Sequence, residues 1–170
     1  MKITKIFSVI FSLIAIFLFI NTISSCNGDD SNPDTNYFMT ATINSDIYFE
    51  SKSSLSQAII LNGDNVMGIT GTSDDNRTIQ LQVDLTNYTG GSGTLNEQQV
   101  TFIFSVEDSL FYSTITEGSG TLIVTEEDEN HIKGSFNFTA SLLIGNPSDF
   151  NLGNTITISN GMFNAKKVNQ

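Results

Sequence analysis

The chain has 170 residues, and its 18 acidic residues outnumber its seven lysines and arginines, so the formal net charge is −11. It contains one histidine, one cysteine and no tryptophan. These counts exclude zinc sites built from several histidines or cysteines, and we expect no cofactor. The sequence has no basic stripe that could neutralise phosphates, so a nucleic-acid partner is not expected either.

Residues 1–25 have the layout of a secretory signal. Lys2 and Lys5 form a short positive region, and residues 6–20 follow without a charged side chain. As a helix, this apolar run would rise about 22 Å, which is less than the roughly 30 Å hydrocarbon core of a bilayer. No positive cluster follows it. We therefore favour a cleaved signal over a permanent transmembrane helix.

The segment Ile23-Ser24-Ser25-Cys26 resembles the bacterial lipobox, in which an aliphatic residue and two small residues precede a cysteine. The resemblance implies cleavage before Cys26 and attachment of diacylglycerol to its thiol, usually with acylation of the new amine. Several acyl chains on one residue hold a protein stably on a membrane. Because Cys26 is the only cysteine, it cannot form an internal disulfide, and lipid attachment is expected. The alternative is an incidental cysteine near an ordinary cleavage site.

The segment after Cys26 predicts the location. The acidic run Asn27-Gly28-Asp29-Asp30 resembles the surface-export signal of Bacteroidetes lipoproteins, so we expect the outer membrane and its external face, with the periplasmic face as the alternative. Residues 26–36 are polar and predict a flexible tether. Removing residues 1–25 takes away two lysines and no acidic residue, which leaves a charge of −13. Anionic lipid would repel such a domain, so the membrane contact is expected through the lipid anchor at Cys26.

Alternation of apolar and polar residues with a period of two dominates residues 37–170 and predicts a single all-β domain. Between Thr78 and Leu85 every odd position is isoleucine, leucine or valine and every even position is polar, which indicates a half-buried antiparallel strand. The same pattern predicts strands at Tyr37–Asn44, Gln57–Asn62, Val66–Gly71, Val100–Val106, Leu110–Ile115, Gly120–Thr125, His131–Ala140 and Thr155–Ala165. Short strands joined by short turns predict an antiparallel meander that forms a β-sandwich or a small closed barrel, with a lipocalin-like barrel as one variant.

The last predicted strand has an irregular pattern. Ile156 and Ile158 are apolar at even positions, whereas Phe163 and Ala165 continue the apolar face at odd positions. A β-bulge at Asn160-Gly161 would shift the parity, because glycine tolerates the positive φ that a bulge needs. The alternative is a turn into a separate hairpin, which we disfavour because residues 162–165 are too few to pair well alone.

Three segments carry a family resemblance. They read GSGTLIVT at 118–125, IKGSFNFTA at 132–140 and ITISNGMFN at 156–164. These segments resemble the motifs of an uncharacterised lipoprotein domain family of flavobacteria and their relatives, and the resemblance covers most of the chain after Tyr37. The family has no assigned activity. The resemblance therefore implies no functional residue other than the lipid-bearing Cys26.

Two kinds of residue could start a catalytic or metal site. His131 could act as a general base, but it shares parity with Lys133 and Ser135, so we expect an exposed histidine without a catalytic role. The acidic segment Glu126–Asn130 could hold Ca²⁺ through carboxylate oxygens. It lacks the spaced Asp-x-Asp-x-Asp-Gly loop of a dedicated site, so we favour a solvated hairpin tip and keep calcium as the alternative. The same reasoning applies to Asp74-Asp75-Asn76.

Two surface features are weaker candidates. Carbohydrate-binding surfaces usually offer aromatic platforms, and this chain has only four tyrosines besides its phenylalanines, most of which belong to the signal or to inward strand positions. The tripeptide Asp108-Ser109-Leu110 resembles the short O-glycosylation motif of Bacteroidetes exported proteins, with Ser109 as the acceptor. The alternative, which we favour, is an ordinary turn between two strands.

Three functions remain. We favour a non-catalytic binding or structural module that faces an unknown protein or glycan partner at the cell surface. The second function is a carrier of a small apolar ligand, which needs an interior that phenylalanines do not fill. The third is a carboxylate-based hydrolase such as a glycosidase, although the spacing places no two carboxylates opposite each other. The phenylalanines concerned are Phe102, Phe104, Phe136, Phe138 and Phe163, and the carboxylates are Asp84, Glu97, Glu107 and Glu117.

Overall fold

The computed structural model describes residues 36–61, 65–86, 88, 90–107 and 109–168. Residues 36–170 group into one compact unit, and its core residues all come from positions 39–165. The predicted signal, Cys26 and nearly all of the predicted tether lie outside the described residues. Within the described ranges, no helix is long and apolar enough to cross a membrane.

The described residues are mostly strand, and the prediction of an all-β fold is confirmed. Two short 3-10 helices interrupt the strands, η1 (Ser53–Leu55) and η2 (Pro147–Phe150). The strands are β1 (Phe38–Ile43), β2 (Ile47–Glu50), β3 (Gln57–Leu61), β4 (Val66–Thr72), β5 (Arg77–Asp84), β6 (Gly93–Asn96), β7 (Val100–Val106), β8 (Leu110–Glu127), β9 (His131–Ile144) and β10 (Thr155–Val168).

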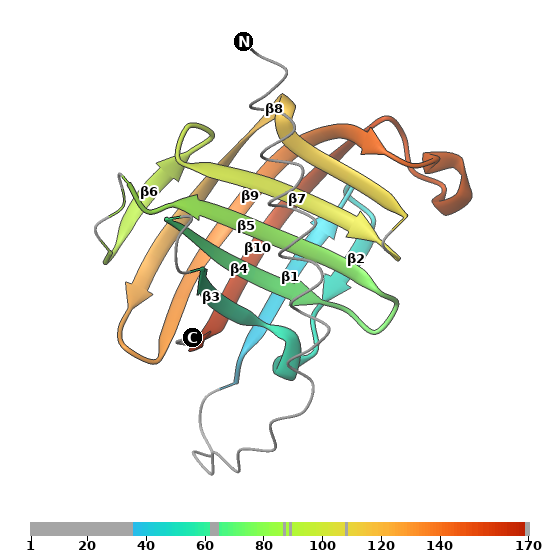
Figure 1. Cartoon of the computed structure of the whole chain (residues 1–170). Helices are drawn as coiled ribbons and strands as arrows, with labels where there is room; N and C mark the ends of the chain where they lie inside the picture. Colours follow the sequence, from blue (N-terminus) through green and yellow to red (C-terminus); the bar gives the residue numbers. More distant parts are fainter. Residues whose placement is uncertain (1–35, 62–64, 87, 89, 108, 169–170) are drawn as a thin grey trace. The chain divides into compact units, whose positions relative to one another are not determined.

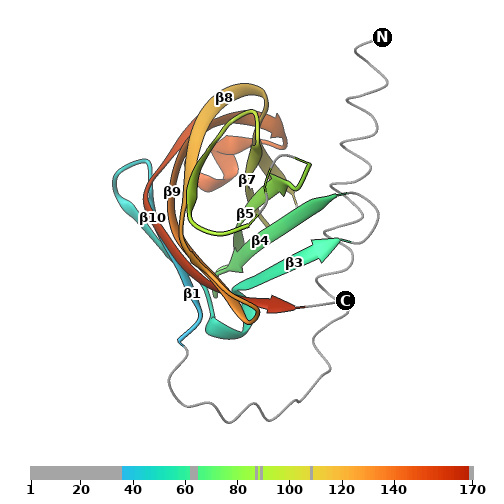
Figure 2. The ribbon, with the colours of Figure 1, turned by 90° about the vertical axis from the view of Figure 1, so that its left-hand side faces the viewer.

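The strands form one sheet in the order β2-β1-β10-β3-β4-β5-β7-β8-β6, with β9 paired to both β10 and β8. The sheet folds over so that the layer of β3, β4, β5 and β7 faces the layer of β9, β10 and β1 (Figure 1, Figure 2). All strand pairs are antiparallel except β10 with β3, which pair over three residues at Lys166–Val168. Because this link is so short, the meander forms a sandwich rather than a clean barrel.

Inward side chains from both layers fill the space between them. Phe102 and Phe104 of β7 face Phe136 and Phe138 of β9 and Phe163 of β10, and each ring is at most 2% exposed. The ring centroids of Phe102 and Phe138 are 5.1 Å apart, and those of Phe136 and Phe163 are 6.3 Å apart. Buried aromatic rings at such distances contribute both area and specific contacts to a core. The prediction that these five residues face the interior is confirmed.

β8 is longer than the sequence predicts. The sequence divides this region into two strands, whereas the structure joins them into one strand of 18 residues. The register against β9 shifts between Ser113 and Gly118, so the residues between them form a bulge and the backbone stays extended. The first part of β8 pairs with β7 and the later part with β6. One strand thereby passes from one layer to the other.

The sequence misses two strands, β2 and β6. Each has four residues, of which one is buried, Phe49 in β2 and Leu95 in β6. Alternation over four residues with one apolar anchor is too short to stand out from a loop. Both strands lie at the ends of the sheet order, where pairing to one neighbour is enough to hold them.

The predicted bulge in the last strand is confirmed, but the residue with a positive φ is not the one that the sequence suggested. The register of β10 shifts between Ile158 and Gly161 against β9. The positive φ of 52° belongs to Asn160 and not to Gly161. Asparagine is among the residues that adopt this conformation most readily. Gly161 is needed for space instead, since a Cβ there would lie 2.6 Å from the ring of Phe136.

β5 shows the predicted alternation, with Ile79, Leu81 and Val83 fully buried in the core. A half-buried strand would leave its polar face exposed, but Thr78 and Gln80 on the polar face of β5 are buried too. β5 is a central strand, and the amide of Gln80 lies over the bare backbone of Gly68 on β4, where a Cβ would be 3.6 Å from Nε2.

Candidate functional site

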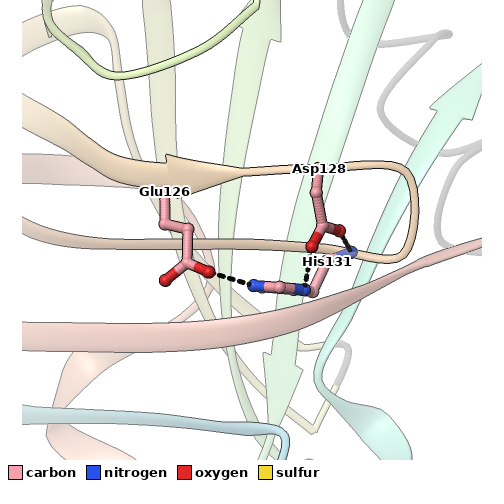
Figure 3. Close-up of side chains that lie close together, drawn as sticks. All are labelled: Glu126, Asp128 and His131. Atoms are coloured by element: carbon pink, nitrogen blue, oxygen red, sulfur yellow. Dashed lines mark hydrogen bonds and ion pairs between the residues drawn. The ribbon is translucent and has the colours of Figure 1, made fainter.

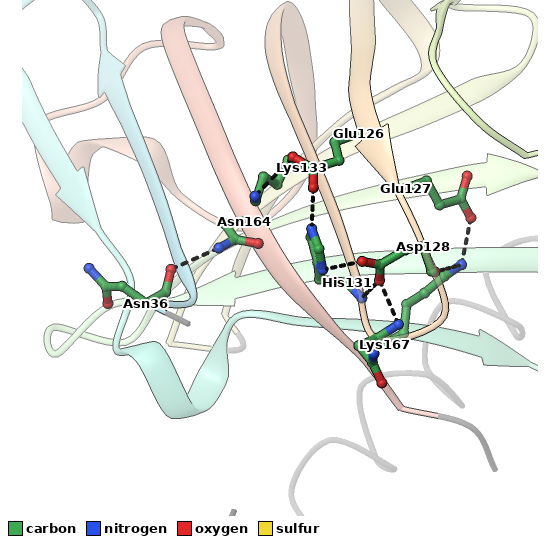
Figure 4. A network of polar contacts seen from close by, with 9 residues as sticks. Asn36, Glu126, Glu127, Asp128, His131, Lys133, Asn164 and Lys167 are labelled. Carbon is green, nitrogen blue, oxygen red and sulfur yellow. Dashed lines mark hydrogen bonds and ion pairs between the residues drawn. The ribbon is translucent and has the colours of Figure 1, made fainter. Parts of the chain in front are cut away.

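The candidate site is a network of charged side chains at the turn between β8 and β9 (Figure 4). Glu126 and Glu127 end β8, Asp128 lies in the turn, and His131 begins β9. Asp128 fixes the turn, because its Oδ1 accepts the backbone N–H groups of Asn130 at 2.7 Å and of His131 at 2.9 Å. An aspartate that binds the backbone two residues on is a common way to build a tight turn.

His131 lies between two carboxylates (Figure 3). Its Nε2 is 3.0 Å from Oε1 of Glu126, and its Nδ1 is 3.0 Å from Oδ2 of Asp128. The predicted parity of His131 is correct, since the next residue, Ile132, is fully buried on the opposite face of β9. The prediction of an exposed side chain is wrong, because the imidazole is only 13% exposed. The two carboxylates lie at the two nitrogen-bearing edges of the ring (Figure 3).

Cations and backbone amides keep these carboxylates ionised. Nζ of Lys133 is 2.9 Å from Oε2 of Glu126, and this hydrogen bond, followed by that of His131, lowers the pKa of Glu126. The backbone N–H groups of Asn130 and His131 lower the pKa of Asp128. Both carboxyl groups are therefore negatively charged at neutral pH, on either side of the imidazole.

A second part of the network is more deeply covered. Nζ of Lys167 on β10 is 2.7 Å from Oε1 of Glu127, and both side chains are at most 15% exposed. Oε2 of Glu127 accepts the hydroxyl of Tyr88 at 2.5 Å and the N–H of Gly91 at 2.8 Å. The network thus ties the end of β10 and the segment before β6 to the β8–β9 hairpin.

Burial and hydrogen bonding act in opposite directions on Glu127. Burial alone would raise its pKa, but the hydrogen bonds from Lys167, Tyr88 and Gly91 together with the charge of Lys167 bring the pKa of Glu127 below its ordinary value. Burial, followed by the nearby Glu127 carboxylate, raises the pKa of Tyr88 well above its ordinary value. Tyr88 therefore stays protonated and acts as a donor.

The arrangement restricts the chemistry that is possible. One ligand atom from each of Glu126, Asp128 and His131 lies within 4.8 Å of the others, so these residues can offer one nitrogen and two oxygens to a metal ion. Both imidazole nitrogens face carboxylates, so His131 is not placed to take a proton from a hydroxyl nucleophile in this geometry. The site is suited to binding a cation more than to acid–base chemistry.

A family model described as a domain of unknown function (DUF6252) matches residues 36–165. The chain belongs to this family. The match confirms the resemblance to an uncharacterised domain family. No curated protein and no solved structure matches the chain. The matched range runs from just before β1 to Ala165 in β10.

The other acidic residues singled out in the DUF6252 domain do not gather at this site. Asp74 pairs with Lys52 at 2.7 Å, and Asp75 pairs with Arg77 at 3.1 Å. Asp84 ends β5, where its hydrogen bonds with Thr86 lower its pKa. The remaining carboxylates of the hydrolase hypothesis are exposed and lie on separate segments. Glu97 lies in the β6–β7 turn, Glu107 in the β7–β8 turn and Glu117 in the β8 bulge.

Within the acidic turn itself, only Glu126 and Asp128 approach His131, because Glu127 turns toward Lys167. Ser109 is exposed, and its hydroxyl donates to the carbonyl of Val106 at 3.3 Å within an ordinary turn. Asp108 lies outside the described residues.

Sequence reasoning missed Asn164. It lies directly opposite Lys133 in the β9–β10 register, and its Oδ1 is buried and has no hydrogen-bond partner among the described residues. The sequence offered one indication of this region. Lys133 and His131 both occupy odd positions, and the odd positions lie on the outward face of β9. The pairing partner on β10 could not be assigned without knowing the bulge.

Proposed function

We propose that the DUF6252 domain of this chain is a non-catalytic binding or structural module, held on the external face of the outer membrane by a lipid on Cys26. The observation that supports it best is an exposed surface on β8, β9, β10, β1 and β2, which we call the outer face. It consists of the exposed Tyr48, Ile123 and Met162 and the half-buried Thr40, Thr42 and Ser135.

Strand register brings these residues together. Ile123 pairs with Ser135, Ser135 with Met162, and Met162 with Thr40, and residues that pair directly in a sheet point to the same face. Tyr48 pairs with Thr42 on the same side. Tyr48, Met162 and Ile123 are 64%, 53% and 40% exposed. Large apolar side chains that lie uncovered on one face, among hydroxyl groups, are typical of a binding surface.

The packed interior also favours this proposal over the two alternatives. Five phenylalanines occupy the space in which a carrier would hold its ligand. A hydrolase would need two carboxylates across a cleft, and the candidates are distributed over separate turns.

Site-specific photo-crosslinking in intact cells tests the proposal. A photoreactive residue at position 48 or 162 should give a discrete crosslinked product, because both positions lie on the outer face. A matched probe at Glu97, which is exposed in the β6–β7 turn, should give none. Equal products at all three positions, or no product at positions 48 and 162, would contradict the proposal.

A further inference from the structure

We propose that Glu126, His131 and Asn164 form a binding site for a first-row divalent transition-metal ion of the zinc class, with Asp128 as the positioning residue for His131. The proposal rests on the geometry of the β8–β9 hairpin and of β10. It is independent of the lipid anchor and of any partner on the outer face.

The spacing of the first two ligands fits a metal ion. Zinc binds imidazole nitrogen and carboxylate oxygen at about 2.0–2.2 Å, so two tetrahedral ligands lie roughly 3.3 Å apart. Nε2 of His131 and Oε1 of Glu126 are 3.0 Å apart. An ion can therefore replace the hydrogen bond between these atoms with a small movement of the Glu126 side chain, which is about half exposed.

Asn164 supplies the independent observation. The side chain is 7% exposed, and its Oδ1 has no hydrogen-bond partner among the described residues. The Nδ2 group donates to the carbonyl of Asn36 at 3.0 Å on the β1 side, so the oxygen faces the β9 side, toward Lys133 and His131 (Figure 4). A buried acceptor without a partner is costly, and a metal ion or its bound water would satisfy it.

Asp128 prepares His131 for this role. Its Oδ2 binds the Nδ1 side of the ring, which leaves Nε2 as the nitrogen that faces Glu126. Metal-binding histidines usually donate their other N–H to a carboxylate, which fixes the tautomer and the ring orientation. The two backbone hydrogen bonds to Oδ1 hold Asp128 itself in place.

Lys133 opposes the ion and so gives a distinctive test. Its Nζ binds Oε2 of Glu126 at 2.9 Å, on the oxygen that does not face His131. The ammonium repels a cation, but the side chain is more than one-third exposed and can turn toward water. Removing this charge should therefore tighten metal binding at Glu126 and His131.

The ligand set selects the metal class. One imidazole with a carboxylate and an amide oxygen suits zinc and its neighbours, since imidazole is a good ligand for zinc, copper and nickel. Calcium takes six to eight oxygen ligands, and the pairing of Glu127 with Lys167 removes one of the oxygens that the turn could have offered. We expect zinc to bind more tightly than calcium.

Isothermal titration of residues 36–170 with Zn²⁺ tests the proposal, because this compact unit contains every core residue that the structure describes. We expect one saturable site, loss of binding in His131→Gln, binding about 10–100-fold weaker in Asp128→Asn and tighter binding in Lys133→Gln. Glu129→Gln removes a charge from the same turn and should leave the affinity unchanged. Circular dichroism melts establish that each variant is folded.

Three results would overturn the proposal. They are zinc binding that His131→Gln does not reduce, several equivalent sites whose affinity falls equally in Glu129→Gln, and weaker rather than tighter binding in Lys133→Gln. If His131→Gln fails to fold, Asp128→Asn and Lys133→Gln still decide the outcome, because both of these side chains are substantially exposed.

Discussion

Glycines in the long strands make room for the phenylalanine core. Gly134 lies near the start of β9, and a Cβ there would lie 2.1 Å from the carbonyl oxygen of Ile123 and 2.8 Å from the ring of Phe163. A Cβ at Gly120 of β8 would likewise lie 2.6 Å from the ring of Phe102. The rings occupy the volume that side chains at these positions would take, so strand and core geometry depend on each other.

We expect Gly134→Ala to lower the free energy of unfolding by roughly 1–3 kcal/mol, the usual cost of overpacking a core. The added methyl group meets backbone as well as a ring, and backbone cannot move aside easily. Urea unfolding measures the loss. Gly93→Ala in β6 is the matched control, since a Cβ there meets nothing within 4 Å, and equal losses in both variants would contradict the packing argument.

Asn160 allows a second test at the residue scale. Its φ of 52° suits asparagine or glycine, whereas a β-branched residue is strained in this conformation. Asn160→Val should therefore lose about 1–2 kcal/mol of stability, while Asn160→Gly keeps the bulge. Thermal or urea unfolding of the two variants compares them directly. The side chain is exposed, so lost packing cannot explain the difference.

At the scale of elements, the β8–β9 hairpin is fastened by charges. The pKa of Glu127 in the folded protein lies below its ordinary value of 4.5. Ionised Glu127 therefore stabilises the fold above about pH 4.5, and this contribution is lost as the pH falls through the lowered pKa. Glu126 and Asp128 act in the same direction.

We predict that the urea midpoint of the wild type falls as the pH is lowered below about 4.5. Glu127→Gln should be less stable at pH 7 but should lose less stability on acidification, because the group that titrates is gone. Glu117→Gln, a change on an exposed part of β8, should follow the wild-type profile. Parallel pH profiles for wild type and Glu127→Gln would refute the role assigned to this carboxylate.

The sequence predicts strands best where the alternation is unbroken, whereas β9 and β10 extend four and three residues beyond their predicted ends. β5 and β7 match their predicted bounds to within one residue, because each buries at least three apolar side chains on one face. β2 and β6 could not be predicted, since each buries one. The path of β8 between the layers depends on a bulge that no local pattern marks.

The candidate site was predictable only in part. The sequence singles out His131 and the acidic turn. The local sequence alone, however, does not determine whether the imidazole is exposed at a solvated hairpin tip or largely covered. The contacts of the imidazole depend on which carboxylates turn toward the ring. Glu127 is turned away by Tyr88 and Lys167, which lie 39 and 40 residues from it along the chain. Asn164 joins through a register that the β10 bulge sets.

At the scale of the whole molecule, the protein combines a β-domain with the proposed lipid anchor. The described domain is an all-β sandwich with a filled core, an outer face of exposed apolar side chains and a charged hairpin. The proposed lipid on Cys26 would hold this acidic domain at a membrane that its own charge does not favour. The binding proposal depends on the anchor to present the outer face to partners.

The intact mass of the protein purified from membranes tests this claim most directly. We predict a mass equal to residues 26–170 plus the acyl groups on Cys26, and a Cys26→Ser variant that remains an uncleaved precursor without fatty acid. A mature chain whose Cys26 is unmodified, or membrane-bound protein that begins at another residue, would contradict the account.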